Sequence, residues 1–334
     1  MRKAVLIRSL SGLLLLQAAQ FVFADAETRA TPSQPAQATS VAQNQSLQAL
    51  FAKMSRVSHN LNYQGAFTYE HQNSSTLQGF RVSHWVEDGV EYERLLYLNG
   101  PEREIVRHGQ ALDCFSPGDQ LLQGRLSSIG SRLIGLDELY QFQIRYTERV
   151  AGRMATVLQV VPRDEFRYGY VLSVDQETGL VLKSLMIDGT GRILERYQFL
   201  ELDLNPDIKQ LQEAPTARLH RVANAQLGGC NRTQGGEPEG WAVKWIPSGF
   251  AFVGQQRVRD AADMLMYTDG LSTFSVFIEP ASAQPPEGIG QRGATVAFMS
   301  KVKRDDQIHR LTVVGEIPAV AAERVAAGVA ATAK

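Results

Sequence analysis

Apolar residues recur at helical spacing in one early segment and alternate with polar residues in much of the rest. In residues 46–61 the helical positions are Leu47, Leu50, Phe51, Met54, Val57 and Leu61. This pattern predicts one amphipathic helix with Ser46 as its N-cap. Residues 25–45 are mainly Ala, Gln, Thr, Ser and Pro. We expect this leader to be disordered, because it has little apolar surface to bury.

From residue 62 onwards the apolar period changes to two, as in strands that bury one face. Phe67 and Tyr69 alternate with polar or small residues, and Asp88-Gly89 and Ala151-Gly152 mark turns. Residues 127–143 read as a helical or irregular insertion. Residues 46–205 therefore predict a large antiparallel half-barrel with helices on its concave face. A half-barrel of this kind can enclose an apolar cavity for a lipid.

A second β-rich domain is expected at residues 239–334. It follows a boundary at residues 206–238 that is rich in Pro, Gly, Asn and Gln and holds a short helix at residues 208–212. Strand patterns begin at Trp241, and an Ala-rich helix with Pro318 in its first turn ends the chain. The expected fold class is α+β, with the half-barrel followed by a small antiparallel sheet domain that carries a C-terminal helix.

One hairpin of the second domain can be specified in detail. Asp269-Gly270 predicts a two-residue turn, in which Thr268 faces Leu271, Tyr267 faces Ser272 and Leu265 faces Phe274. One face would then support the C-terminal helix through its valines. That face carries Leu265, Tyr267, Phe274, Val276 and Ile278, and the helix valines are Val320, Val325 and Val329. The opposite face would contact a flexible partner, because methionine adapts to varied surfaces. It carries Met264, Met266, Thr273, Ser275 and Phe277.

The first 24 residues have the features of a cleaved signal peptide. Arg2, Lys3 and Arg8 are basic, a short apolar run follows, and "VFA" at residues 22–24 offers small residues for cleavage. The run is shorter than the ~20 residues that span a bilayer. We therefore expect an exported protein that is soluble after cleavage. The net charge of −1 gives no general attraction to nucleic acid.

Motifs of catalysis are missing from the sequence. It contains no phosphate-binding loop, no His-Glu-x-x-His, no Cys-x-x-Cys and no Gly-x-Ser-x-Gly. "GIGQRG" at residues 288–293 matches the dinucleotide formula, but a strand does not precede it and a helix does not follow it, so we interpret it as a loop. These observations predict no enzymatic activity, cofactor or metal. Cys114 and Cys230 are either bridged or two free thiols.

Several blocks of the sequence, in order, resemble the RseB/MucB family of periplasmic regulators of envelope-stress sigma-factor signalling. They are "LNYQGAFTYE", "YLNGPEREIVRHG", "YVLSVDQETGLVLKSLMIDGTGRILERYQF", "WIPSGF", "YTDGLSTFSVF" and "LTVVGEIP". The resemblance implies an N-terminal domain similar to LolA and LolB. It also implies binding to the periplasmic segment of a membrane anti-sigma factor (RseA or MucA), protection of that segment from the first regulated protease, and release on binding lipid or lipopolysaccharide. In pseudomonads this pathway controls alginate production.

Two other functions stay open from the residues alone. A lipid or lipoprotein carrier would need the half-barrel but not the second domain, and an unrecognised hydrolase would need a catalytic set that is not visible. A homodimer also stays open. The candidates to line the lipid cavity are Phe51, Met54, Phe67, Tyr69, Leu96 and Phe199. The partner-binding candidates are Met264, Met266, Tyr267, Phe277, Trp241, Trp245, Arg257 and Arg259. Ordinary core packing is the competing interpretation of the apolar ones.

Overall fold

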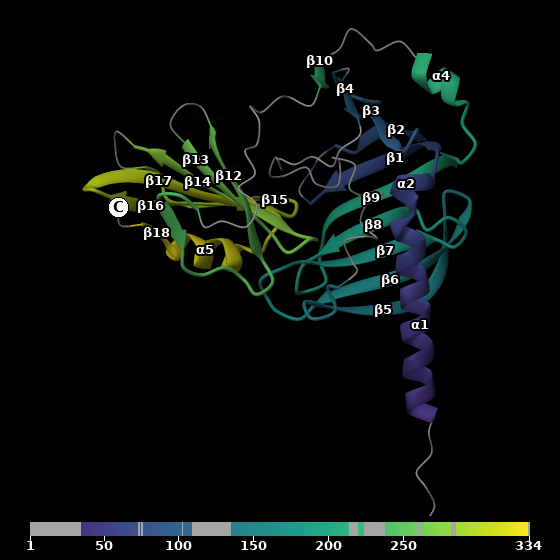
Figure 1. Ribbon diagram of the computed structural model, residues 1–334, viewed down its shortest axis with the longest axis horizontal. Helices are drawn as coiled ribbons and strands as arrows, with labels where there is room; N and C mark the ends of the chain where they lie inside the picture. The colour runs from purple at the N-terminus through teal and green to yellow at the C-terminus, as the bar shows by residue number, and fades with distance from the viewer. Residues whose placement is uncertain are drawn as a thin grey trace, which may run out of the picture. The chain divides into compact units, whose positions relative to one another are not determined.

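Two sheets make up most of the described chain (Figure 1). The computed structural model describes residues 35–72, 74, 76–101, 103–108, 135–213, 220–223, 238–258, 262–281 and 285–332. The predicted signal peptide, Cys114, Cys230 and Arg259 lie outside these ranges, as do residues 127–134 of the expected insertion at 127–143. Residues 140–143 of that insertion are strand, so they were wrongly predicted to be helical or irregular. Residues 41–334 form one compact unit.

The first sheet, called here the N-terminal sheet, has ten strands among the described residues, in the order β10-β4-β3-β2-β1-β9-β8-β7-β6-β5. Their bounds are β1 (Tyr63–His71), β2 (Gln78–Glu87), β3 (Val90–Tyr97), β4 (Arg103–His108), β5 (Tyr140–Val150), β6 (Arg153–Pro162), β7 (Gly169–Asp175), β8 (Val181–Ile187), β9 (Ile193–Asp203) and β10 (His220–Ala223). The nine strands from β1 to β9 pair antiparallel, which confirms the predicted meander. The sheet is open, because β10 and β5 stand at its ends.

β10 was not expected, because it lies in the segment predicted to be a linker. It pairs parallel with β4, with His220 opposite Arg103 and Ala223 opposite Val106. Parallel pairing requires a long connection back to the same end of the sheet. The chain between β9 and β10 provides that length, and it contains the short helix α4 (Ile208–Glu213). The helix predicted at residues 208–212 is thereby confirmed.

Helices α1 (Pro35–Ser55) and α2 (Val57–Asn60) replace the single helix predicted at residues 46–61. The start at Pro35 means that residues 35–45, expected to be disordered, are helical. Their Ala and Gln content explains this, because both residues have high helix propensity even without apolar surface to bury. Phe51 and Met54 of α1 and Val57 of α2 pack into the core of the N-terminal sheet. We call the sheet face that they contact the helix-covered face.

The second sheet, the C-terminal sheet, has the strand order β12-β13-β14-β17-β16-β15 in the described chain. Its strands are β12 (Ala251–Val258), β13 (Ala262–Thr268), β14 (Thr273–Pro280), β15 (Gly288–Arg292), β16 (Thr295–Arg304) and β17 (Gln307–Gly315). Helix α5 (Ala319–Ala327) contacts β16 and β17. Strand β11 (Trp241–Val243) pairs with β18 (Val329–Ala331) at the end of the chain. The predicted sheet domain with a C-terminal helix is therefore confirmed.

The hairpin of β13 and β14 differs from its prediction in loop length. Thr268 pairs with Thr273 and Leu265 with Val276, so residues 269–272 form a four-residue loop and the two-residue turn is wrong. Asp269 has no positive φ, which a type I′ turn would require. Its Oδ1 instead accepts hydrogen bonds from the backbone N–H groups of Leu271 (2.9 Å) and Ser272 (2.6 Å). This capping holds the wider loop closed.

The register shift is two residues, so every side chain keeps its predicted face. The face predicted to support the helix is the core of the C-terminal sheet, and Val325 of α5 packs there as expected. Val329 packs there too, but it belongs to β18 and not to the helix. Val320 does not, because 41% of its surface is exposed.

Candidate functional site

The structure brings five of the six lipid-cavity candidates together on the helix-covered face. Phe51, Met54, Phe67, Tyr69 and Phe199 are each at most 5% exposed and belong to one apolar cluster. The ring of Phe67 lies 4.5 Å from that of Tyr197 and 5.1 Å from that of Phe80, which adds two aromatic residues to the set. In this structure they are packed core residues, and a role in holding a lipid stays a prediction.

Leu96 is the exception, and its assignment to the helix-covered face is wrong. Leu95 is 2% exposed and belongs to the core cluster, whereas Leu96 is half-buried and outside it. Successive side chains of a strand point to opposite faces, so only one of two adjacent leucines can face the core. The run of two leucines hides this phase in the sequence.

His84 introduces polar chemistry on the helix-covered face. Its ring is 1% exposed and stacks on Tyr63 with 5.1 Å between centroids. Nδ1 lies 2.8 Å from the carbonyl oxygen of Leu61, a geometry in which Nδ1–H donates. In the neutral ring the other nitrogen, Nε2, is an acceptor, and it is buried without a hydrogen-bond partner in the described part of the chain. A hydroxyl or amide group of a ligand would satisfy it.

A buried carboxylate and a buried phenol accompany this histidine. Glu93 pairs with His84 across β2 and β3 and is 8% exposed. Burial raises the pKa of Tyr197 well above its ordinary value, and the charges of Tyr63 and Glu93 act in the same direction. Tyr197 therefore remains a neutral hydrogen-bonding group at physiological pH.

Four of the seven partner-binding candidates that the structure describes are buried. Trp241 is 1% exposed and donates its indole N–H to Asp263 Oδ2 at 3.0 Å, and Tyr267 is 3% exposed. Met264 and Met266 are 6% and 4% exposed. The expectation that this methionine face is an accessible surface is therefore wrong. Replacing Met266 with Ser should disturb the fold as well as any binding.

Three further candidates remain. Phe277 is half-buried, and Arg257 is exposed beside Asp263 at 3.5 Å. Trp245 is half-buried between Arg324, 4.3 Å from its ring centroid, and Phe166, whose ring is edge-on at 5.0 Å. Phe166 belongs to the N-terminal half of the chain, so Trp245 lies at a contact between the two halves.

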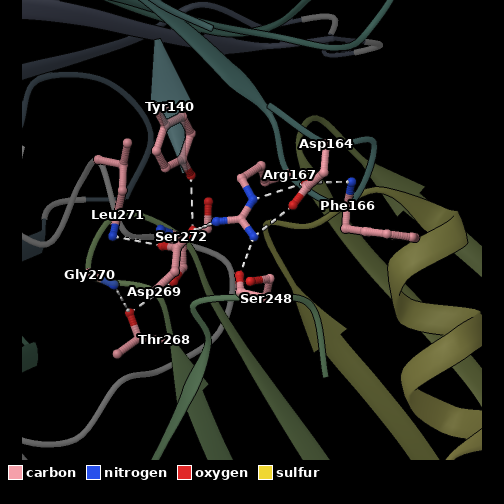
Figure 2. Close-up of polar contacts among 10 residues, drawn as sticks. All are labelled: Tyr140, Asp164, Phe166, Arg167, Ser248, Thr268, Asp269, Gly270, Leu271 and Ser272. Carbon is pink, nitrogen blue, oxygen red and sulfur yellow. Dashed lines mark hydrogen bonds and ion pairs between the residues drawn. The ribbon is translucent and has the colours of Figure 1, made fainter. Parts of the chain in front are cut away.

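That contact contains a buried ion pair, which we call the junction (Figure 2). Arg167 lies in the loop between β6 and β7, where the Asp164 carboxylate accepts the N–H of Phe166 at 3.0 Å. The same carboxylate accepts Arg167 Nε at 3.0 Å and Nη2 at 2.9 Å. These bonds hold the guanidinium in one orientation, because its donors form a rigid planar fork.

Asp269 from the hairpin loop completes the junction. Its Oδ2 accepts Arg167 Nη1 at 2.8 Å and the Tyr140 hydroxyl at 3.0 Å, and both charged side chains are 0% exposed. Burial raises the pKa of the Asp269 carboxyl, while the N–H groups of Ser272 and Leu271 and the charge of Arg167 oppose that rise. Burial likewise raises the pKa of Tyr140, so its hydroxyl keeps its proton and donates.

Further contacts surround this pair. Arg167 Nη2 donates to the backbone carbonyl of Ser248, and the guanidinium lies 5.5 Å from the ring of Tyr140 and 5.4 Å from that of Phe250. Leu271 packs into the core cluster of the N-terminal sheet, and Phe166 packs against that of the C-terminal sheet. The C-terminal half thus contributes Leu271 and Ala294 to the core of the N-terminal sheet, and Phe166 packs in the opposite direction.

Sequence reasoning did not find the junction. Asp269 was assigned to a tight turn, and Arg167 and Tyr140 were not singled out. Arg167 and Asp269 are 102 positions apart, so no local pattern relates them. The one available signal was the Asp-Gly pair itself, which marks a loop but not a second role for its carboxylate.

The helix-covered face suits binding of apolar groups, and the junction suits orientation of the two halves. Among the residues that the structure describes, no group of three or more metal-ligating side chains converges, and no helix is both long and apolar enough to cross a bilayer.

Two family models match the chain. Residues 46–217 match the MucB/RseB N-terminal domain, and residues 236–330 match the MucB/RseB C-terminal domain. Together they cover both sheets apart from β10.

Curated relatives carry the same names. The chain is 38% identical over 278 residues to the sigma factor AlgU regulatory protein MucB of Pseudomonas aeruginosa. The matched region spans 79% of this chain and 84% of that protein. It is 28% identical over 294 residues to the sigma-E factor regulatory protein RseB of Escherichia coli K12, spanning 83% and 88%.

Solved structures agree with the sequence matches. A crystal structure of MucB in complex with MucA(peri) has a TM-score of 0.70 at 33% identity, and covers 86% of this chain and 100% of that one. A crystal structure of MucB has a TM-score of 0.63 at 33% identity, covering 86% and 98%. The two family models, the sequence relatives and these structures lead to one conclusion: this chain belongs to the MucB/RseB family.

Proposed function

We propose that this chain is a non-enzymatic periplasmic regulator that binds the periplasmic segment of a membrane anti-sigma factor. The observation that carries the proposal is the similarity, over 86% of the chain, to MucB in its complex with MucA(peri). The basic and apolar start of the sequence supports export. A disordered segment gains affinity by covering a large surface, which suits a protein that presents two joined sheets.

Binding would shield the anti-sigma segment from regulated proteolysis, since a protease needs an extended and accessible chain. Release would follow when lipid or lipopolysaccharide binds the helix-covered face of the N-terminal sheet. The aromatic core there offers apolar contacts for acyl chains, and His84 Nε2 offers an acceptor for a hydroxyl or amide group. The lipid can act as a switch only if it binds the free and complexed forms with different affinity.

The binding step is tested by titration calorimetry. The mature chain is titrated with a synthetic peptide of the anti-sigma periplasmic segment, with a scrambled peptide as the control. We expect saturable binding of the first peptide alone. Failure of the native peptide to bind would overturn the proposal.

The shielding and release steps are tested on the same complex. The regulated protease should cleave the peptide more slowly when this chain is present, and added lipopolysaccharide should restore both cleavage and free peptide. Peptide binding that is undiminished at saturating lipopolysaccharide would remove the release step while leaving the binding step intact.

A lipid or lipoprotein carrier is the second candidate, favoured by the apolar core between α1 and the N-terminal sheet. A carrier should transfer acyl chains between vesicles and show no affinity for the anti-sigma peptide. The calorimetric titration therefore separates the two functions.

A further inference from the structure

The junction has the properties of an orienting contact between the two halves. Arg167 and Asp269 come from loops on different sheets, and both side chains are 0% exposed. Taking two charges out of water costs about as much as their attraction returns, so a buried pair adds little net stability. The raised pKa of Asp269 agrees, because it means that burial disfavours the ionised carboxylate.

What the pair does supply is a single geometry. The fork of Arg167 is fixed on its own side by two bonds to Asp164, and its remaining donors reach Asp269 and the Ser248 carbonyl. The acceptors on the other side belong to two separate loops of the C-terminal half. A guanidinium that satisfies all of them permits one relative placement of the loops, because its donors are coplanar.

The junction can open without unfolding either sheet. Each sheet has its own apolar core, built around residues such as Phe67 and Leu172 in one and Val276 and Val313 in the other. Opening at the junction would expose Leu271 and Phe166 and return the charged pair to water, while the halves would stay joined at a second contact, where the Ala294 N–H donates to Glu195 Oε1 at 3.0 Å. The relative placement of the halves is therefore separable from the stability of each half.

We propose that Arg167 and Asp269 are positioning residues for partner binding, which hold the two halves in the one arrangement that lets an extended anti-sigma segment contact both. The inference rests on the proposed function and adds to it the residues that set the geometry of the binding surface. Neither side chain touches the partner, since neither is accessible.

The test compares two arginine substitutions. Arg167→Met keeps the length and apolar stem of the side chain but removes every bond that the guanidinium makes across the junction, which leaves the Tyr140 hydroxyl on Asp269. We expect it to weaken binding of the anti-sigma peptide by at least about tenfold, because the open state then competes with the binding-competent one. Arg153→Met is the matched control. Arg153 bonds Asp175 through Nε and Nη2, both at 3.0 Å, but the two lie within the N-terminal sheet. The affinity of the Arg153→Met variant for the anti-sigma peptide should stay within about twofold of wild type.

A second variant removes the charge of Asp269 while keeping the hydrogen bonds that close its loop. Asp269→Asn keeps an oxygen for the N–H groups of Leu271 and Ser272 while removing the charge opposite Arg167. It should weaken binding like Arg167→Met, and the double variant should lose no more than either alone, because the residues act as one unit. Additive losses would overturn the idea of a shared junction.

Amide hydrogen exchange distinguishes opening from unfolding. In Arg167→Met, exchange should become faster at residues 164–168 and 269–272 and stay unchanged in β14 and β17. Unchanged peptide affinity in this variant would overturn the proposal, as would faster exchange throughout the C-terminal sheet. If the wild-type chain binds no peptide, it is the proposed function that fails. Unchanged exchange at residues 269–272 in Arg167→Met would show that Arg167 does not hold the junction.

Discussion

Leu95 and Leu96 are neighbours of the same type with different surroundings. Leu95 is 2% exposed and packs in the core of the N-terminal sheet, while Leu96 lies on the other face opposite Arg81 and Glu104. Neither composition nor propensity distinguishes them. The phase of the strand alone decides which of the two stabilises the fold.

The first prediction uses this pair. Leu95→Ala should lower the free energy of unfolding by about 2–5 kcal/mol, because it removes buried methylene groups and leaves a cavity. Leu96→Ala, the matched control, should cost about 1 kcal/mol or less. Urea denaturation followed by circular dichroism measures both. Equal losses in the two variants would contradict the assigned strand phase.

Asp175 provides a pH-dependent prediction. Burial acts to raise its pKa, but hydrogen bonds from Arg153 and Thr178 outweigh burial and hold the pKa below its ordinary value. The stability that the carboxylate contributes is therefore fully present above its unfolded pKa of about 3.9, and is lost as pH falls through the folded value. Asp175→Asn should destabilise the protein at pH 7, and the difference from wild type should shrink below about pH 4. A difference that is constant down to pH 3 in denaturation curves would refute this account.

At the scale of elements, the sequence predicted strand and helix types well and loop details less well. Most strands of both sheets, α4 and α5 occur where the sequence pattern placed them, but β10 lies in the predicted linker and β15 replaces the loop predicted at residues 288–293. The β13–β14 loop did not follow local turn statistics, because the Asp269 side chain caps one end of the loop and pairs with Arg167 from its other oxygen. Asp269, which indicated a turn in the sequence, thus pairs with Arg167 only in the folded chain.

Gly315 shows how closely the strands of the C-terminal sheet approach. A Cβ atom at this position of β17 would lie 2.5 Å from Phe274 Cβ and 2.5 Å from the Thr273 carbonyl oxygen. Gly315→Ala should therefore destabilise the fold by about 1–3 kcal/mol, since the atoms in the way include backbone. Gly290→Ala in β15 is the control, because a Cβ there meets nothing within 4 Å. Thermal unfolding that is equal in the two variants would contradict the packing at β17.

For the whole molecule, two cores coexist within one compact unit, residues 41–334. Leu271 and Phe166 each pack against the other half's core, and the junction lies between them. Cooperative unfolding of the unit therefore depends on contacts between loops as well as on the two cores.

The last prediction concerns this cooperativity. Trp85 belongs to the N-terminal sheet, and Trp241 and Trp245 to the C-terminal half, so fluorescence in a Trp85→Phe background reports mainly on the latter. In that background, fluorescence and far-ultraviolet circular dichroism should give coincident unfolding transitions. Adding Arg167→Met should separate them, whereas adding Arg153→Met should not. Coincident transitions with Arg167→Met would mean that the junction does not couple the halves.

The sequence alone determined the order and type of most elements, the division of the chain into two β-rich parts, and the family blocks. It could do so because alternation, turn residues and helical spacing are local properties of the chain. The tertiary structure decided which of two adjacent leucines faces the core, that Trp241 and the methionine face are buried, and that Asp269 meets Arg167. These depend on pairing between segments that are distant along the chain, and such pairing is fixed only when the sheets pack.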